Sequence, residues 1–495
     1  MVFSSHIFLY YFLPVCLLLY YALYKAPQRW RNACLAVLGY IFYGWANPKF
    51  IFLMFATTFV DWLLSLVIAY DSWRFWKDWR SKVEPLEKVV ATGQPRSRRQ
   101  KWAIIASVVS NLMMLGFFKY FNFGIDSYNA LVASLGLASW QWDSFFRVVL
   151  PLGISFYTFQ SLSYTIDVYR GDAKAMRNFV DFSCFVSMFP HLVAGPILKF
   201  SYLADQLEHR TLTADKFARG VAMFCLGLGK KVLLANPCGK IADSAFAAGS
   251  LHAGDAWLGV GGYSMQIYFD FSGYSDMAIG LGLMMGFVFA KNFDSPYKSE
   301  SITEFWRRWH ISLSTWLREY LYIPLGGNRL GKVRTYVNLA LTMLLGGLWH
   351  GASWNFVIWG GIQGGMLAFE RAQGRDSLYR RLPRVMRVGA TFAIITLAWV
   401  FFRAADLHSA MLYLGSMFGA TRPAAGAGLV GGLLHQPYYV VCLLAAGAVA
   451  WSCPNSWDWT RRISLPKALL CAILLAAAMV VLATQEYNPF IYFIF

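Results

Sequence analysis

Long apolar runs with almost no charge restrict the fold of this chain more than any other feature. An α-helix needs about 20 apolar residues to cross the ~30 Å of hydrocarbon in a bilayer. Runs near that length lie at 7–23, 32–45, 50–70, 102–120, 147–168, 180–199, 218–236, 257–288, 335–350, 353–369, 388–403, 426–451 and 466–484. Several are too short to span, so some must be re-entrant or buried in protein. We expect an all-α polytopic membrane protein with about eleven true spans.

The low charge content excludes the ordinary soluble classes. Charged residues make up 14% of the 495 residues and hydrophobic residues make up 57%. A soluble protein carries roughly 25% charged residues, so a cytosolic enzyme is excluded. Intrinsic disorder is excluded as well, because it requires low hydrophobicity.

Much of the net charge of +18 lies in short loops between the apolar runs. Residues 71–101 hold nine basic and four acidic side chains, and residues 371–387 hold six basic and one acidic. Lys and Arg are enriched in cytoplasmic loops, so both loops are expected on the cytoplasmic face. The loop at 121–146 carries Asp126 and Asp143 but no basic residue, and is expected outside together with the N-terminus. This topological use of the basic residues argues against nucleic-acid binding.

The densest polar patch, residues 294–328, predicts one amphipathic helix. Ser301 and Glu304 resemble a capping box at its start, and Pro324 ends it. Bulky side chains recur on one face at helical spacing, namely Trp306, Trp309, Leu313 and Trp316. A helix lying at the membrane interface accounts for these aromatics and for the arginines beside them.

Two histidines lie in segments whose other residues are explained by an interfacial helix or by an apolar run. The interfacial helix gives no reason for His310, which lies one residue beyond the aromatic face with Ser314 one turn away. His350 interrupts the apolar run 343–361, where glycines allow another backbone or an elongated substrate to approach its ring. An ionisable group at membrane depth is costly and tends to face a cavity, although a satisfied structural histidine is the alternative. A cavity histidine suits general-base activation of a hydroxyl for acyl transfer.

Two carboxylates, Asp270 and Asp276, lie inside the apolar segment 263–280. They suit a role in orienting a histidine or lining a polar path. Local hydrogen bonding to Ser272 or Ser275 explains each of them equally well.

The spacing of the cysteines, histidines and glycines does not match known metal-binding or phosphate-binding motifs. The eight cysteines form no metal-ligand pattern and no histidines pair at i, i+4, so we expect no metal. The glycines of 226–231 do not fit a P-loop, and those of 280–286 indicate close helix packing instead.

Six blocks of sequence, in order, resemble the membrane-bound O-acyltransferase family. They are MVFSS at the start, PLGISFYTFQSLSYTIDVYRGD (151–172), FPHLVAGPILKF (189–200), YFDFSGYSDMAIGLGLMMGF (268–287), SITEFWRRWHISLSTWLREYLYIPLGGNR (301–329) and LLGGLWHGASW (344–354). The likeness is greatest to the bacterial branch that O-acetylates exopolysaccharides such as alginate. It covers most of residues 1–370 and is weaker at 71–101 and after residue 405.

The resemblance implies a fold and a site. The fold is a ring of about eleven transmembrane helices, with re-entrant and interfacial helices, around a central tunnel. The chain is expected to form one domain over 1–495, with 71–101 as a basic cytoplasmic loop and 263–361 as the catalytic core segment. The family's two characteristic histidines map onto His350, expected as the base, and His310, expected as a supporting catalytic residue. Residues expected to line the tunnel are Asp270, Asp276, Trp309, Ser314, Tyr320 and Asn355.

The resemblance also implies a function. An acetyl group from a cytoplasmic thioester, acetyl-CoA or another acetyl thioester, crosses the bacterial inner membrane for O-acetylation of a secreted exopolysaccharide, alginate first. No tightly bound cofactor is expected, and the partners are periplasmic or membrane-anchored serine-hydrolase-like acetyltransferase subunits. Acetylation of cellulose or another secreted glycan is the nearest alternative. A transporter or exporter is the alternative from another class, although no second copy of the histidine blocks suggests an inverted repeat.

Overall fold

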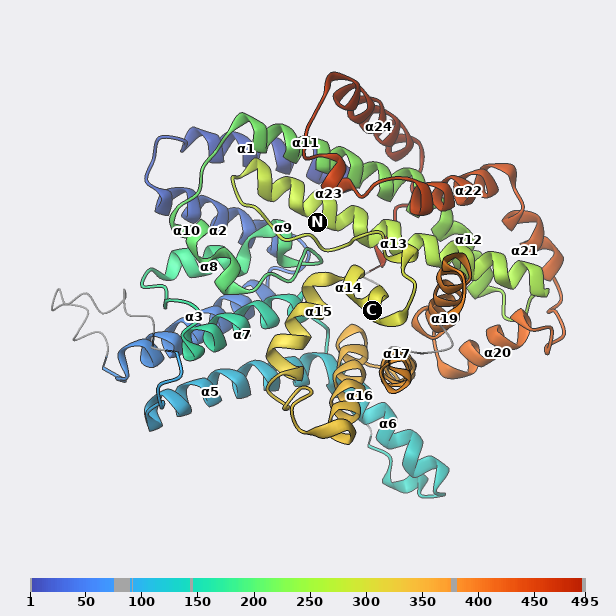
Figure 1. Ribbon diagram of the computed structural model, residues 1–495, viewed down its shortest axis with the longest axis horizontal. Helices are drawn as coiled ribbons and strands as arrows, with labels where there is room; N and C mark the ends of the chain where they lie inside the picture. The colour runs from blue at the N-terminus through green and yellow to red at the C-terminus, as the bar shows by residue number, and fades with distance from the viewer. Residues whose placement is uncertain (1, 75–89, 91, 143–145, 375–380, 492–495) are drawn as a thin grey trace. The chain divides into compact units, whose positions relative to one another are not determined.

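Helices make up all the regular structure in the described part of the chain. The computed structural model describes residues 2–74, 90, 92–142, 146–374 and 381–491, and no strand occurs among them (Figure 1). The prediction of an all-α protein is therefore confirmed. By packing, the chain divides into a first unit, Met1–Thr213 with Met285–Phe289, and a second unit, Ala214–Met284 with Ala290–Phe495. This division does not test whether the chain folds as one domain, which stays a prediction.

The first unit is held together by aromatic and polar contacts between helices. Ser107 and Asn111 of one helix donate hydrogen bonds of 2.7 and 2.9 Å to the buried carboxylate of Asp61 on another. These bonds satisfy a carboxylate that is costly to bury. The helices of this unit are α1 (Leu13–Ala22), α2 (Gln28–Gly44), α3 (Phe50–Tyr70), α5 (Arg98–Leu115), α6 (Phe121–Ser134), α7 (Ile154–Arg170), α8 (Phe179–Ser187), α9 (Phe189–Leu192) and α10 (Phe200–Glu208).

The second unit is built around α13 (Ala253–Met284), which packs on both α11 and α12 (Figure 1). Nearly every residue of α13 from Gly262 onward is buried, which explains why its sequence is apolar on all faces. The other helices of the unit are α11 (Ala214–Gly229), α12 (Asn236–Ala247), α14 (Ile302–Arg308), α15 (Ile311–Leu317), α16 (Gly331–His350), α17 (Trp354–Gln373), α19 (Arg384–Arg403), α20 (Leu407–Met417), α21 (Ala427–Leu434), α22 (Pro437–Ser452), α23 (Ser456–Trp459) and α24 (Leu465–Thr484).

Small residues allow α11 and α13 to cross closely. A Cβ atom at Gly280 would lie 2.5 Å from the carbonyl oxygen of Gly220 and 2.8 Å from the backbone nitrogen of Phe224. Only glycine fits at such a distance. The predicted helix packing by the glycines of 280–286 is confirmed at Gly280.

Four helical stretches of the described chain are long and apolar enough to cross a bilayer. They are Phe50–Tyr70, Arg98–Ser134, Arg384–Arg403 and Leu465–Thr484, and the pair α21 and α22 adds a fifth if its 60° bend lies within one span. The protein is therefore a membrane protein. The count of about eleven spans stays a prediction, since shorter and buried helices do not pass this test.

Two of the apolar runs that are candidate spans are not continuous helices. In the run 180–199, α8 ends at Ser187 and only a four-residue helix follows, because Pro190 and Pro196 cannot continue a helical hydrogen-bond ladder. The run 426–451 is divided between α21 and α22, since the residue before Pro437 disfavours helical backbone.

The two predicted cytoplasmic loops fall partly outside the described residues. Residues 75–89 and 91 belong to the loop 71–101, and residues 375–380 belong to the loop 371–387. The side of the membrane that each loop faces stays a prediction.

Candidate active site

His310 lies at a break between two short helices of the second unit. The single helix predicted between Ser301 and Pro324 is wrong, because α14 ends at Arg308 and α15 begins at Ile311. His310 has φ 43° and ψ 54°, a left-handed conformation that is strained for a residue with a side chain. Strain of this kind persists only where the surroundings enforce it, and it clusters at functional sites.

The segment 292–294 enforces the break. The Ile311 N–H donates to the Asn292 carbonyl at 2.9 Å, and the Asp294 N–H donates to the Arg308 carbonyl at 2.9 Å. These two bonds replace bonds that a continuous helix would make. The Asn292 side-chain oxygen also accepts from the Ser312 N–H and hydroxyl at 3.1 and 2.8 Å. The sequence alone did not identify Asn292 or Ser312.

The same Asn292 oxygen orients the His310 ring. His310 is fully buried, and its Nδ1 lies 3.3 Å from the Asn292 oxygen. Burial lowers the pKa of His310 well below its usual value, and the neighbouring His350 lowers it further. A neutral ring that donates from Nδ1 leaves a lone pair at Nε2. Among the described residues Nε2 has no hydrogen-bond partner, so it presents a buried proton acceptor.

His350 is the last residue of α16 and is 7% exposed. Helix α16 packs closely on α17, because a Cβ atom at Gly347 would lie 2.2 Å from the carbonyl oxygen of Phe356. Gly347 therefore allows the backbone of α17 to lie close to α16. The approach of a backbone or an elongated substrate to the His350 ring itself stays a prediction. The His350 ring is surrounded by aromatic rings, with centroids 4.9 Å from Trp349, 5.4 Å from Trp359 and 5.1 Å from Phe402.

The structure brings the two predicted histidines together. Their ring centroids are 6.4 Å apart, although forty residues of sequence separate them. His350 lines an enclosed cavity of about 10 Å³, named here the histidine cavity, whose other walls are Ile267, Phe271, Trp309, Trp359, Trp399, Phe402 and Ile491. His310 packs edge-on against one of these walls, Phe271, at 4.7 Å. Such a volume holds about one water molecule, so the cavity admits a small group and little solvent.

Asp270 lies in a buried ion pair near this cavity. Its Oδ1 is 2.8 Å from Lys231 Nζ, and the two side chains are 1% and 2% exposed. Its Oδ2 accepts a hydrogen bond of 2.8 Å from the Ile491 N–H. Asp270 therefore holds the segment that follows α24 beside the histidine cavity. The sequence did not single out Lys231, because nothing in its apolar segment indicates which residue it pairs with.

The remaining predicted site residues are dispersed. Trp309 lines the histidine cavity, and the Ser314 hydroxyl donates to the Trp309 carbonyl at 3.4 Å. Asp276 is bound by Lys230 at 2.7 Å. The Asn355 side chain donates to the Ala404 carbonyl at 2.9 Å, and the Tyr320 ring packs against a neighbouring tryptophan. Apart from Trp309, these four residues are not among those that line the histidine cavity, and their place on a substrate path stays a prediction.

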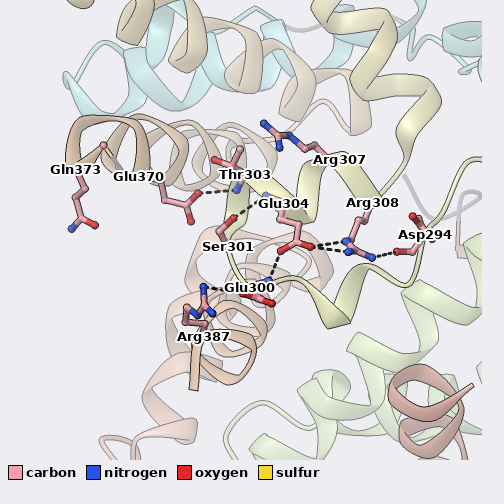
Figure 2. A pocket seen from close by; sticks show the side chains of 11 residues that line it. Asp294, Glu300, Ser301, Thr303, Glu304, Arg307, Arg308, Glu370, Gln373 and Arg387 are labelled. Atoms are coloured by element: carbon pink, nitrogen blue, oxygen red, sulfur yellow. Dashed lines mark hydrogen bonds and ion pairs between the residues drawn. The ribbon is translucent and has the colours of Figure 1, made fainter. Parts of the chain in front are cut away.

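A second, much larger hollow lies at the start of α14, and we name it the charged pocket. Its volume is about 770 Å³, and Figure 2 shows its lining residues Asp294, Glu300, Ser301, Thr303, Glu304, Arg307, Arg308, Glu370, Gln373, Gly374 and Arg387. The predicted cap is confirmed in part. Ser301 Oγ accepts from the Glu304 N–H at 3.0 Å, but the Glu304 carboxylate binds the Glu300 N–H instead of the Ser301 N–H.

The carboxylates of the charged pocket are already bound. Glu370 of α17 accepts from two N–H groups at the start of α14, at 2.6 and 2.8 Å, and Glu304 pairs with Arg308 at 2.8 Å (Figure 2). Glu300 pairs with Arg387 at 2.8 Å. Arg307 is exposed and makes no hydrogen bond or ion pair with any described residue. It is therefore available to an anionic ligand.

The described residues contain no group of three His, Cys, Asp or Glu side chains placed to hold a metal ion. The expectation that the site uses no metal stays a prediction.

Comparison with known proteins identifies the family. Residues 173–405 match the model of the membrane-bound O-acyltransferase family. The chain is 46% identical over its full length to the full-length probable alginate O-acetylase AlgI of Pseudomonas putida, and 42% identical, again over both full lengths, to that of Pseudomonas aeruginosa. It is 36% identical to a peptidoglycan O-acetyltransferase of Helicobacter pylori, over 85% of this chain and 80% of that protein. The chain belongs to the membrane-bound O-acyltransferase family and is an O-acyltransferase.

Proposed function

We propose that this O-acyltransferase passes acetyl groups from a cytoplasmic thioester across the bacterial inner membrane for the O-acetylation of alginate. The observation that carries the proposal is the pair of histidines, 6.4 Å apart, beside a closed cavity with aromatic walls. The full-length relatives named alginate O-acetylases support alginate as the polymer. Acetyl-CoA or another acetyl thioester is the donor in this proposal.

Acyl transfer from a thioester to a hydroxyl requires one general base and a site from which water is excluded. His350 accepts the proton of an acceptor hydroxyl while the hydroxyl oxygen bonds to the carbonyl carbon of the thioester. The carbon–sulfur bond breaks, the leaving thiolate takes up the proton, and the products are an acetyl ester and a free thiol. A cavity of about 10 Å³ leaves little room for water that would hydrolyse the thioester. His310 assists as a neutral, oriented ring with a proton-accepting Nε2.

The charged pocket supplies the donor side of the proposal. Gln373, Gly374 and Arg387 line it and belong to the loop 371–387, which the positive-inside rule assigns to the cytoplasm. Arg307, which has no ion-pair partner among the described residues, lies three residues before His310 in the same segment. Arginine binds phosphate groups well, so it suits the anionic part of a cytoplasmic thioester donor.

Partner subunits complete the reaction in this proposal. The acetyl group leaves on the periplasmic face and is placed on the polymer by serine-hydrolase-like acetyltransferase subunits. The relatives named alginate O-acetylases support membership of such an acetylation system.

The test is the acetyl ester content of secreted polymer in cells that depend on this chain. His350→Ala is expected to leave the amount of alginate unchanged and to remove its acetyl esters. His252→Ala, which truncates an exposed histidine of the same unit, is the matched control and should retain acetylation. Both proteins are quantified in the membrane fraction.

Each alternative outcome points to a different function. Loss of the polymer itself in the His350→Ala cells would contradict acyl transfer and favour export. Unchanged alginate esters together with loss of acetyl groups from cellulose or peptidoglycan would replace the proposed polymer. Full acetylation of alginate by His350→Ala protein would remove His350 from the mechanism.

A further inference from the structure

The last described residues of the chain enter the core of the second unit. After α24 the backbone is non-helical from 485 to 490, and Phe490 and Ile491 are 3% and 1% exposed. The Phe490 ring stacks on Tyr274 of α13 with centroids 4.6 Å apart. Asn236 Nδ2 donates to the Tyr487 carbonyl at 3.3 Å. Buried non-helical backbone needs partners for its N–H and C=O groups, so specific contacts must hold this segment in the core.

A buried ion pair holds this segment by its backbone. Asp270 Oδ2 accepts from the Ile491 N–H at 2.8 Å, and Lys231 Nζ donates to the Pro489 carbonyl. The two side chains also pair with each other at 2.8 Å while almost completely buried. Burying two charges is expensive unless their hydrogen bonds are satisfied. Here both charged groups bind the backbone of the terminal segment, so the pair fixes the position of Ile491.

Ile491 forms one wall of the histidine cavity. The other lining residues belong to the stretch from Ile267 to Phe402, and five of them are aromatic rings of the packed core. Ile491 is the lining residue that comes from the segment after α24. With a volume of about 10 Å³, the cavity holds about one group the size of a water molecule or a methyl, so a longer acyl chain fits only if a wall such as Ile491 moves.

We propose that Ile491, positioned by Lys231 and Asp270, sets the size of the acyl group that reacts at His350. This inference rests on the proposed acetyl transfer and assigns its selectivity to the terminal segment. The branched side chain fills the space that the next carbon of a longer acyl chain would occupy. Acetyl is accepted, and propionyl is disfavoured by steric overlap with Ile491.

The predicted size of the effect follows from pocket selectivity. A hydrophobic pocket discriminates one methylene by roughly 10- to 200-fold. Ile491→Ala removes the side chain beyond Cβ, which is more than the single methylene that distinguishes propionyl from acetyl. The ratio of propionyl to acetyl transfer is therefore expected to rise about tenfold or more. Ile491→Val removes one methyl group and should raise the ratio by less.

The experiment uses membranes that contain the full-length protein with its partner subunits and polymer. Acetyl-CoA and propionyl-CoA are supplied together at equal concentration, and mass spectrometry measures both esters on the polymer. The ratio is independent of the amount of protein, because both esters come from the same enzyme. Ile395→Ala is the control: it makes the same truncation in the same packed core, at a residue that is 1% exposed and does not line the cavity.

A raised ratio for Ile491→Ala, a smaller rise for Ile491→Val and an unchanged ratio for Ile395→Ala support the proposal. Acetylation by Ile491→Ala at the wild-type ratio would overturn it while leaving the acetyltransferase function in place. An equal rise in Ile395→Ala would overturn it too, because general loosening of the core would then explain the change. Absence of both esters with wild-type protein would overturn the proposed function and this inference together.

Discussion

The histidine cavity and the charged pocket are lined by neighbouring residues of one segment, but they differ in volume and in the polarity of their walls. The first measures about 10 Å³ and has aromatic and aliphatic walls, and the second measures about 770 Å³ and has charged walls (Figure 2). Arg307 and Arg308 face the charged pocket, whereas Trp309 lines the histidine cavity. The helix break at His310 separates the two environments within a few residues.

This difference separates recognition from chemistry. Charged groups in a wide, hydrated pocket attract and orient an ionic ligand, but water screens each of them. In the closed cavity each hydrogen bond is strengthened because water is excluded. Burying an uncompensated charge there costs free energy for the same reason. We therefore expect substitutions at the cavity to have large effects and substitutions at the pocket to have small ones.

The largest expected effect is the loss of acetyl transfer when a histidine of the site is replaced. His310→Ala should lower the rate of acetyl transfer by about 100-fold or more, the usual contribution of a positioned proton acceptor. The lowered pKa of His310 also predicts that its ring stays neutral as the pH falls below the usual histidine pKa of about 6.5. Rates measured with saturating thioester check the first point, and NMR titration of the His310 ring checks the second. A His310 ring that takes up a proton already at pH 6.5 would contradict the neutral, buried ring.

The next effect is on stability. Asp270→Ala leaves Lys231 buried without its partner and should lower the free energy of unfolding by about 3–5 kcal/mol. Thermal unfolding of the purified protein in detergent measures the change. The double variant Lys231→Met with Asp270→Leu removes both charges and should recover most of the stability. A double variant as unstable as Asp270→Ala would show that packing around the pair, not the orphaned charge, is responsible.

Arg307 tests the charged pocket as a donor site. Arg307→Ala should raise the KM for an anionic thioester by about 3- to 10-fold with little change in kcat, since an exposed charge contributes roughly 1 kcal/mol. Arg307→Lys keeps the charge and should recover part of the affinity, and added salt should reduce the difference between the variants. An equal fall in kcat would place Arg307 in the chemical step. Donor binding at the charged pocket and chemistry at the histidine cavity would then not be separate.

The smallest expected effect is at the rim of the same pocket. Arg384 pairs with Glu300 at 3.0 Å, but its side chain is 71% exposed. Arg384→Ala should change the free energy of unfolding by no more than about 0.5 kcal/mol. The same thermal unfolding experiment applies. A loss comparable to that of Asp270→Ala would show that the pocket is not hydrated as described.

Many of the helices and the two histidines could be predicted from the sequence because each leaves a local signal. Apolar runs at span length marked α3, whose bounds 50–70 match the structure, and titratable rings in apolar surroundings marked His310 and His350. The helix break at His310 left no such signal, because it depends on hydrogen bonds from Asn292, a residue from a preceding loop. Local spacing predicted a continuous helix there.

The residues missed around the site have non-local causes. Lys231 and Ile491 contact Asp270 from distant parts of the sequence, and periodicity carries no information about such contacts. Trp359 and Trp399 are forty residues apart in the sequence, yet their rings stack 5.8 Å apart in the cavity wall. Asp276 and Asn355, expected on a substrate path, bind Lys230 and the end of α19.

The central claim is that acyl transfer occurs at the histidine cavity. The most direct measurement is transfer of radiolabelled acetyl from acetyl-CoA to polymer by membranes that contain equal amounts of wild-type, His350→Ala or His252→Ala protein. The account predicts wild-type transfer for His252→Ala and a loss of at least about 100-fold for His350→Ala. Transfer by His350→Ala at the wild-type rate would contradict it.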